Sequence, residues 1–263
     1  MRLNNKWLAV VLALAVIPLF GCSFLSKLKA RDNLNKGVKA FTEMKYDAAA
    51  QFFEKSLALD PNFEIARVYL ATSYTSQFVP GSTDPKSELM AKKGIATFEE
   101  VAAHPQDPAN QKTAMISIAS LYYQLKQFEK SKEWCHKILQ IDPQNAEAYY
   151  RMAVIDFDDV FEKTGVQGEN VEFMNPDEKT RALNNIEEGL TSLNKALEIR
   201  SGYFDAMEYK NLLWREKAKF EKDEAEKAKY LQEADKISRD ALQLRLKAQE
   251  EEAKMPKKLG KVK

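Results

Sequence analysis

Two segments of this chain share one pattern, and their spacing restricts the fold more than any other feature of the sequence. They cover residues 46–61 and 128–143, and each is an amphipathic stretch that ends in Asp-Pro. A small residue lies 24 positions before each closing proline, and another follows 34 positions after the first. These small residues are Gly37 and Ala71 for the first segment and Ala119 and Ala153 for the second. A period of about 34 residues is typical of stacked helical hairpins.

The residues at these positions resemble the tetratricopeptide repeat pattern. In that family a small residue on the first helix lets the second helix approach closely. The second helix carries a small residue, then an aromatic one, then another small one, which Ala49, Phe53 and Ser56 match. The resemblance implies an all-α fold, an α-α superhelix of about five helix pairs with a long C-terminal capping helix.

Composition agrees with helices and excludes two functional classes. The 263 residues include only 9 Gly and 9 Pro, fewer than an all-β chain with many tight turns requires. The formal net charge is +1, from 40 basic and 39 acidic residues. Such a balance gives no indication of a nucleic acid or of a strongly acidic substrate as partner.

The repeats are predicted to occupy residues 30–222, with two insertions. The excess over the repeat period falls near residues 79–86 and 163–177. Insertions in repeat proteins map to loops and often carry the specific function. Within residues 223–254, apolar side chains recur at helical spacing and form a single long stripe. This pattern predicts a helix that closes the last hairpin. The basic end, residues 255–263, is expected to be a disordered tail.

The N-terminus has the features of an export signal. Arg2 and Lys6 precede an apolar run over residues 7–20, which is too short to cross a bilayer. The run ends in Leu-Phe-Gly-Cys, which resembles the lipobox of bacterial lipoproteins. The resemblance implies that residues 1–21 are a signal peptide and that Cys22 carries diacylglycerol and a fatty acid such as palmitate. An ordinary signal peptide that ends near a cysteine is the alternative.

The lipobox also implies a location. Residues 22–29 would be a lipidated N-terminus and short linker that holds the repeats close to the membrane. Ser23, rather than Asp, follows the cysteine, which in bacteria with two membranes implies the outer membrane, facing the periplasm.

No catalytic chemistry is apparent in the sequence. Cys135 and His136 are adjacent, but neighbouring residues on a helix do not face each other, so an inert buried thiol is favoured over a metal ligand. Carboxylates at positions 156–159 lack the spacing of a calcium loop, which favours a solvated helix end. Phosphate-binding glycine loops and nucleophile elbows are missing. We expect no enzyme activity, no metal, no cofactor and no small-molecule substrate.

A protein or peptide partner is the better prediction. In the tetratricopeptide family, the first helix of each pair lines a concave groove. The resemblance assigns the following residues to that groove: Phe41, Tyr69, Tyr123, Tyr150, Arg151, Phe157 and Tyr209. Aromatic rings give large contact areas at low entropic cost. The alternative is that these rings belong to the core, as aromatic residues at helical spacing usually do.

Three functions follow from this combination. The first is a membrane-anchored adaptor or scaffold that holds a partner protein in the bacterial cell envelope. The second is an assembly factor for outer-membrane barrels or a pilus secretin, which rests on architecture alone. The third is a structural homo-oligomer formed through the capping helix or the tail.

Overall fold

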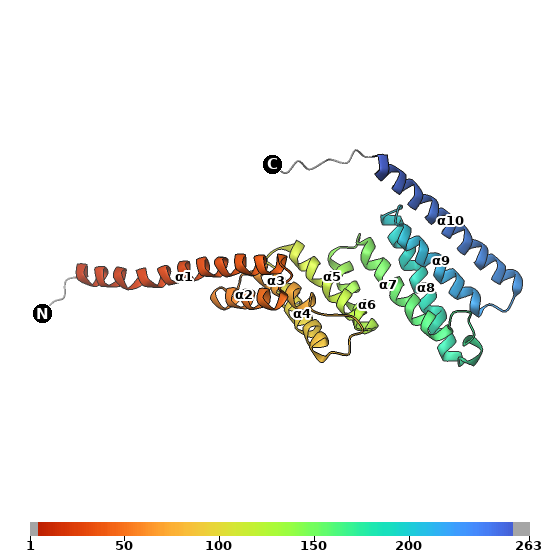
Figure 1. Cartoon of the computed structure of the whole chain (residues 1–263), viewed down its shortest axis with the longest axis horizontal. Helices are drawn as coiled ribbons and strands as arrows, with labels where there is room; N and C mark the ends of the chain where they lie inside the picture. The colour runs from red at the N-terminus through yellow and green to blue at the C-terminus, as the bar shows by residue number, and fades with distance from the viewer. Residues whose placement is uncertain (1–4, 255–263) are drawn as a thin grey trace. The chain divides into compact units, whose positions relative to one another are not determined.

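All regular secondary structure in the described part of the chain is helical. The computed structural model describes the backbone of residues 5–254 and the side chains of residues 24–251. Within these limits it contains ten α-helices and one 3-10 turn, and no strand (Figure 1). The helices are α1 (Asn5–Thr42), α2 (Tyr46–Leu59), α3 (Glu64–Thr75), α4 (Pro85–Ala103), α5 (Pro108–Gln124), α6 (Phe128–Ile141), α7 (Ala146–Thr164), α8 (Pro176–Ile199), α9 (Phe204–Phe220) and α10 (Glu224–Lys254). The predicted all-α fold of about five helix pairs is confirmed.

The helices fall into two compact units. Unit 1 spans Met1–Lys126 and contains α1 to α5, and unit 2 spans Gln127–Lys263 and contains α6 to α10. Within each unit, every helix contacts the next one along the chain. In unit 2, α7 also contacts α9, so the first helices of successive hairpins lie side by side. This is the arrangement from which repeat proteins build a continuous surface.

Prolines and capping side chains next to the helices determine where several of them begin and end. Helices α2 and α6 end directly before an Asp-Pro pair, because proline lacks an N–H and restricts the residue before it. Helices α4, α5 and α8 begin with proline in the first turn after a capping side chain. In α8 the cap is reciprocal: Asn175 accepts from the Glu178 N–H, and Glu178 accepts from the Asn175 N–H, both at 2.9 Å.

The core of unit 1 depends on the small residue at the start of the repeat. Gly37 on α1 is buried, and a methyl group added there would overlap the ring of Phe53 on α2. The same two helices are joined by a hydrogen bond of 2.7 Å from the Ser56 hydroxyl to the Ala30 carbonyl. The predicted pattern of glycine, aromatic residue and serine thus packs one hairpin.

Helix α1 is longer than the sequence predicted. Residues 22–29, expected as a linker, are helical and continue into the repeat. The reason is that residues 24–36 contain neither Gly nor Pro, so nothing interrupts the helix. Ser26 adds a contact to the body of unit 1, because its hydroxyl donates to the Leu59 carbonyl at 2.5 Å.

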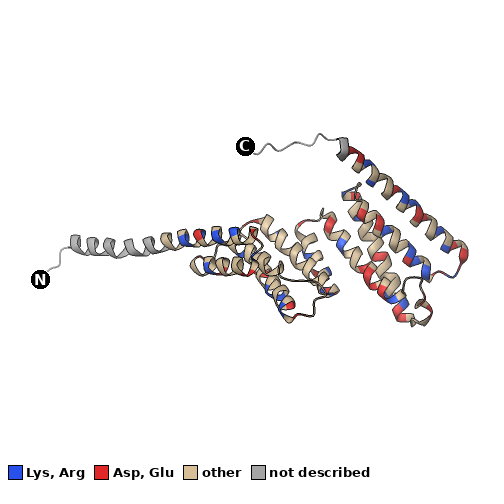
Figure 2. Cartoon of the chain, in the orientation of Figure 1, with Lys and Arg blue, Asp and Glu red and all other residues tan. Residues whose placement is uncertain are grey.

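Unit 2 ends on the predicted capping helix. Ala234, Ile237 and Ala241 of α10 are buried, and α10 contacts α9. The apolar stripe therefore closes the last hairpin, while charged residues cover the other side of the helix (Figure 2). Lys222 and Asp223 lie in the short turn before α10, and the two helices that it joins are antiparallel.

Both insertions are connections whose ends are fixed by hydrogen bonds. The first joins α3 to α4, where Val79 N–H donates to the Ser87 hydroxyl at 2.8 Å. The second joins α7 to α8 through the 3-10 turn Val171–Phe173. Its start is held by α9, because Lys219 Nζ donates to the Gly165 carbonyl at 2.7 Å. The Thr164 hydroxyl donates to the buried Glu216 carboxylate at 2.7 Å.

Candidate functional site

Five aromatic rings of unit 2 form a continuous row on α7, on α9 and in the turn before α9. In order along the row they are Tyr203, Tyr150, Tyr209, Phe157 and Phe161. The centroids of successive rings are 5.0, 5.5, 5.5 and 5.4 Å apart. The two contacts of Tyr209 are nearly perpendicular, at 83° and 86°, which is a favoured edge-to-face geometry. We call this set the aromatic row.

A cation lies over the ring at each end of the aromatic row. The guanidinium carbon of Arg200 is 3.2 Å from the centroid of Tyr203. At the other end, Lys219 Nζ is 5.1 Å from the centroid of Phe161. Both distances are within the range of cation–π attraction. The Tyr203 hydroxyl donates to Glu147 at 2.5 Å, which fixes that ring in the turn before α9.

The rings differ in exposure. Tyr203 is buried, Tyr150, Tyr209 and Phe157 are half-buried, and Phe161 is exposed. Burial raises the pKa of Tyr150 and of Tyr209, and the nearby carboxylate of Asp205 raises both further. The phenols therefore stay protonated at neutral pH and can donate hydrogen bonds.

Three of the seven residues predicted to bind a partner are members of this row. Tyr150, Phe157 and Tyr209 form its centre, and the neighbouring Arg151 pairs with Glu147 at 3.6 Å. The sequence prediction missed the two end rings. Phe161 could have been found, since it lies one helical turn after Phe157. Tyr203 could not, because it precedes its helix.

The other three predicted residues belong to unit 1. Phe41 makes edge contacts with Tyr46 and Tyr69, at centroid distances of 5.2 and 6.1 Å. Tyr69 is also stacked on the buried Phe53 at 5.4 Å, so these rings support the first hairpin. Tyr123 is half-buried on α5. For this unit the alternative interpretation, aromatic residues that complete a core, agrees with the contacts.

Cys135 and His136, the residues considered for metal or catalytic chemistry, do not form a reactive site. Cys135 is buried, and burial raises the pKa of its thiol to about 12, so it is a protonated core residue. His136, its neighbour, is exposed. Among the described residues, no group of three or more His, Cys, Asp or Glu is placed to hold a metal ion.

Asp156 corrects one expectation about the acidic run. The sequence favoured a solvated helix end, but this side chain is only 1% exposed. It forms an ion pair with Lys132 of α6, and Lys132 also lies 3.7 Å from Glu188 of α8. Burial raises the pKa of Asp156 to about 6, although Lys132 opposes the shift. The residue lies inside the bundle because α8 places Gly189 against it.

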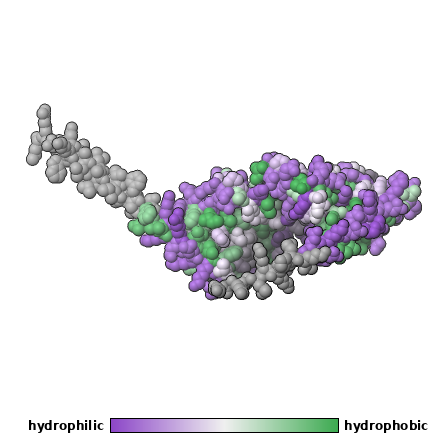
Figure 3. Space-filling model, turned by 90° about the horizontal axis from the view of Figure 1, so that it is seen from above, coloured by the Kyte–Doolittle hydropathy of each residue, from purple (hydrophilic) through white to green (hydrophobic). Residues whose placement is uncertain are grey.

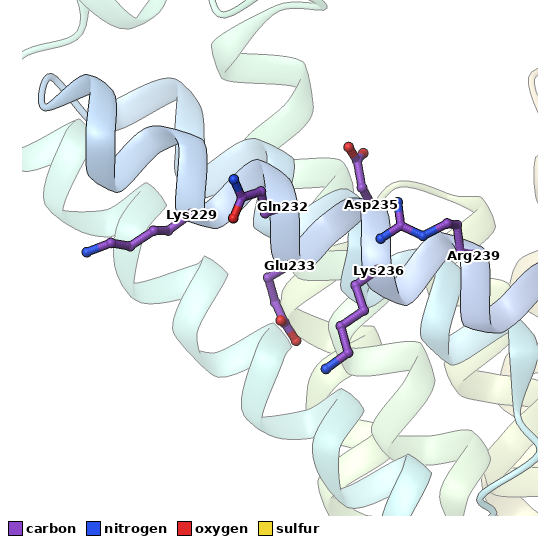
Figure 4. A pocket seen from close by; sticks show the side chains of 6 residues that line it. All are labelled: Lys229, Gln232, Glu233, Asp235, Lys236 and Arg239. Atoms are coloured by element: carbon purple, nitrogen blue, oxygen red, sulfur yellow. The ribbon is translucent and has the colours of Figure 1, made fainter.

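A depression on α10 is not a convincing site. It has a volume of about 440 Å³ and is lined by six residues of this one helix. Figure 4 shows that Glu233 and Lys236 point to one side while Asp235 points to the other, so the side chains do not converge on a ligand. Asp235 is also engaged by Arg215 at 2.6 Å.

The predicted signal peptide and lipidation site lie outside the described side chains. This applies to residues 1–21 and to Cys22. Within the part of the chain that the structure describes, no helix combines the length and the apolar character of a membrane span.

Comparison with known protein families identifies a repeat of paired helices, in agreement with the helical fold. A family model for the tetratricopeptide repeat matches residues 113–145. The search of curated proteins found no significant match to this sequence.

Solved structures of similar fold include MamA and YrrB. A crystal structure of MamA is 13% identical and has a TM-score of 0.54, covering 82% of this chain and 94% of MamA. MamA from Desulfovibrio magneticus RS-1 gives 11% and 0.53, with 81% and 96% covered. YrrB, described as a TPR protein with an unusual peptide-binding site, gives 14% and 0.50, with 83% and 90% covered. Residues 113–145 are thus a tetratricopeptide repeat, and the chain has the fold of a tetratricopeptide repeat protein.

Proposed function

We propose that the chain is a protein-interaction adaptor that binds a segment of a partner protein on the aromatic row. The observation that carries this proposal is the unbroken contact of five rings across two helices. A row of half-buried rings offers apolar area and hydroxyl donors in a fixed arrangement. Such rigid aromatic surfaces are enriched at the energetic centres of interfaces.

The charges beside the row narrow the kind of partner. The carboxylates of Glu147 and Asp205 raise the pKa of Tyr150 beyond the effect of burial, but Glu147 already pairs with Arg151 and Arg200, at 3.6 and 3.8 Å. Arg200 and Lys219 also lie over the two end rings, so charges of both signs border the row. A partner segment with apolar side chains against the rings, and a Lys or Arg opposite the exposed Asp205, would complement this surface. The peptide-binding site of YrrB supports a peptide as ligand for a protein of this fold.

We further propose that Cys22 is lipidated and anchors the chain in the bacterial cell envelope, at the outer membrane facing the periplasm. The lipobox-like sequence Leu19-Phe-Gly-Cys22 at the end of an apolar run supports this. Several acyl chains hold a protein firmly, whereas one does so marginally. Cell fractionation of a Cys22→Ser variant tests it, and unchanged membrane association of the variant would contradict it.

Photo-crosslinking tests the binding surface. A benzophenone amino acid is placed at Tyr209 or, as a control, at Tyr230. Both are half-buried tyrosines of unit 2, but Tyr230 contacts Trp214 at 5.5 Å and lies outside the row. We expect a specific covalent adduct from position 209 only, and a Tyr209→Ala chain that captures much less of that partner. Equal adducts from both positions would contradict a role for the row.

A further inference from the structure

The first residues of α1 whose side chains the structure describes expose apolar groups to solvent. Phe24 is 65% exposed, Leu25 57% and Leu28 46%. Residues four apart on a helix lie on one face, so Phe24 and Leu28 share a face and Leu25 borders it. Figure 3 shows hydrophobic residues at the surface next to the grey N-terminal segment.

Positive charges surround these apolar residues. Lys27, Lys29 and Arg31 are exposed, and residues 24–31 contain no acidic residue. Lys27 and Arg31 line a cavity of about 380 Å³ together with Asp60. Because one carboxylate faces two cations there, this end of the helix keeps a net positive charge. In Figure 2 the basic residues of α1 begin close to the grey segment. A short helix face that is apolar and flanked by cations is the pattern of an interfacial membrane contact.

This end of α1 is fixed to the body of unit 1. Ser26 donates to the Leu59 carbonyl at 2.5 Å, and the fully buried Ala30 accepts from Ser56 at 2.7 Å. The exposed apolar face therefore belongs to a helix that is already packed one turn later. At a helical rise of about 1.5 Å per residue, Phe24 lies only ~3 Å along the axis from Cys22.

We propose that residues 24–31 are a membrane-contacting surface. Phe24, Leu25 and Leu28 enter the boundary between headgroups and acyl chains, and the cations contact anionic headgroups. The surface adds a second attachment to that of the acyl chains and fixes the angle of α1 at the membrane. Its location rests on the proposed lipidation of Cys22, but it is independent of partner binding by the aromatic row.

Spin-label depth measurements on the full-length chain, isolated with its anchor and reconstituted in vesicles, test this inference. A nitroxide is attached at Leu25→Cys or, as a control, at Asn35→Cys, an exposed position further along the same helix. The vesicles contain phosphatidylcholine with or without phosphatidylglycerol. We expect the label at position 25 to be accessible to oxygen and shielded from a water-soluble nickel complex. The label at position 35 should show the reverse.

A charge-reversal variant tests the contribution of the basic residues separately from that of the apolar residues. In the Lys27→Glu, Lys29→Glu double variant, we expect the position 25 label to lose its shielding from nickel on vesicles with phosphatidylglycerol. Free access of nickel to position 25 in the unmodified chain would overturn the inference. Shielding from both reagents would also overturn it, since it indicates a protein contact. Loss of partner crosslinking at position 209 concerns only the proposed adaptor function.

Discussion

The buried pair of Asp156 and Lys132 leads to a prediction about the effect of pH on stability. Asp156 is 1% exposed, and among the described residues neither of its oxygens accepts a well-formed hydrogen bond. Burial raises its pKa from the ordinary 3.8 to about 6, with Lys132 acting in the opposite direction. The folded chain therefore holds a proton on Asp156 at pH values where the unfolded chain has lost it.

The sign and size of the effect follow from proton linkage. A carboxyl whose pKa is raised on folding contributes its stability below the unfolded pKa, and the contribution is lost as pH rises through the folded pKa. A shift of about two pH units corresponds to about 3 kcal/mol in the free energy of unfolding, of which about 2 kcal/mol is lost between about pH 4 and pH 7. Lys132 stays charged throughout, because its carboxylate neighbours raise its pKa by more than burial lowers it.

Replacing Asp156→Asn removes this titration and nearly preserves the shape of the side chain. We expect the free energy of unfolding of the original chain, minus that of the variant, to fall by about 2 kcal/mol from about pH 4 to about pH 7. Urea unfolding followed by tryptophan fluorescence measures it, since Trp134 and Trp214 both lie in unit 2. Asp240→Asn, at an exposed position on α10, is the control for loss of any carboxylate.

The opposite slope would refute the reasoning. If the original chain gains stability relative to Asp156→Asn as pH rises, then attraction to Lys132 exceeds the cost of burying the carboxylate. A difference that does not change with pH would show that Asp156 has the same pKa in both states. Acid effects on the other carboxyl groups act on both chains and cancel in the subtraction.

Three further perturbations have definite expected outcomes. Gly37→Ala should lower the free energy of unfolding by about 1–3 kcal/mol in urea titrations, because the methyl group overlaps the Phe53 ring; unchanged stability would show that the ring moves aside freely. In a Cys22→Ser background, Cys135 should react with Ellman's reagent only as fast as the chain unfolds, since burial raises its pKa; rapid labelling of the native chain would contradict this. Glu216→Gln should weaken the attachment of the 163–177 insertion, visible as faster hydrogen exchange of its amides, while exchange in α2 stays unchanged.

The hairpins were predictable because their packing is encoded at short range. Gly37 and Phe53 contact across a single hairpin, and the repeat period fixes which residues face each other. The Asp-Pro pairs that end α2 and α6 also act on their own helix. Spacing alone therefore located these elements.

The environment of Asp156 was not predictable from the same information. The acidic run looks like a solvated face because three of its four residues, at positions 156–159, are Asp. Its burial depends on Lys132 of α6 and Gly189 of α8, which lie 24 and 33 positions away. The early start of α1 has another reason: the sequence has a processing signal at Cys22 but no Gly or Pro between positions 24 and 36, so the helix continues through the predicted linker.

The aromatic row uses one set of side chains for packing and for the proposed binding surface. The resemblance to the repeat family assigned Tyr150 and Phe157 to one first helix and Tyr209 to the next, but it could not decide between core and surface. The structure gives them both roles: each ring touches rings of the row on one side and remains partly exposed on the other. Aromatic pairs contribute about 0.5–1.5 kcal/mol each beyond burial, so these contacts hold α7 against α9. A surface that is already rigid loses little entropy when a partner binds, and for this reason the contacts that stabilise the fold also favour the binding that we propose for the row.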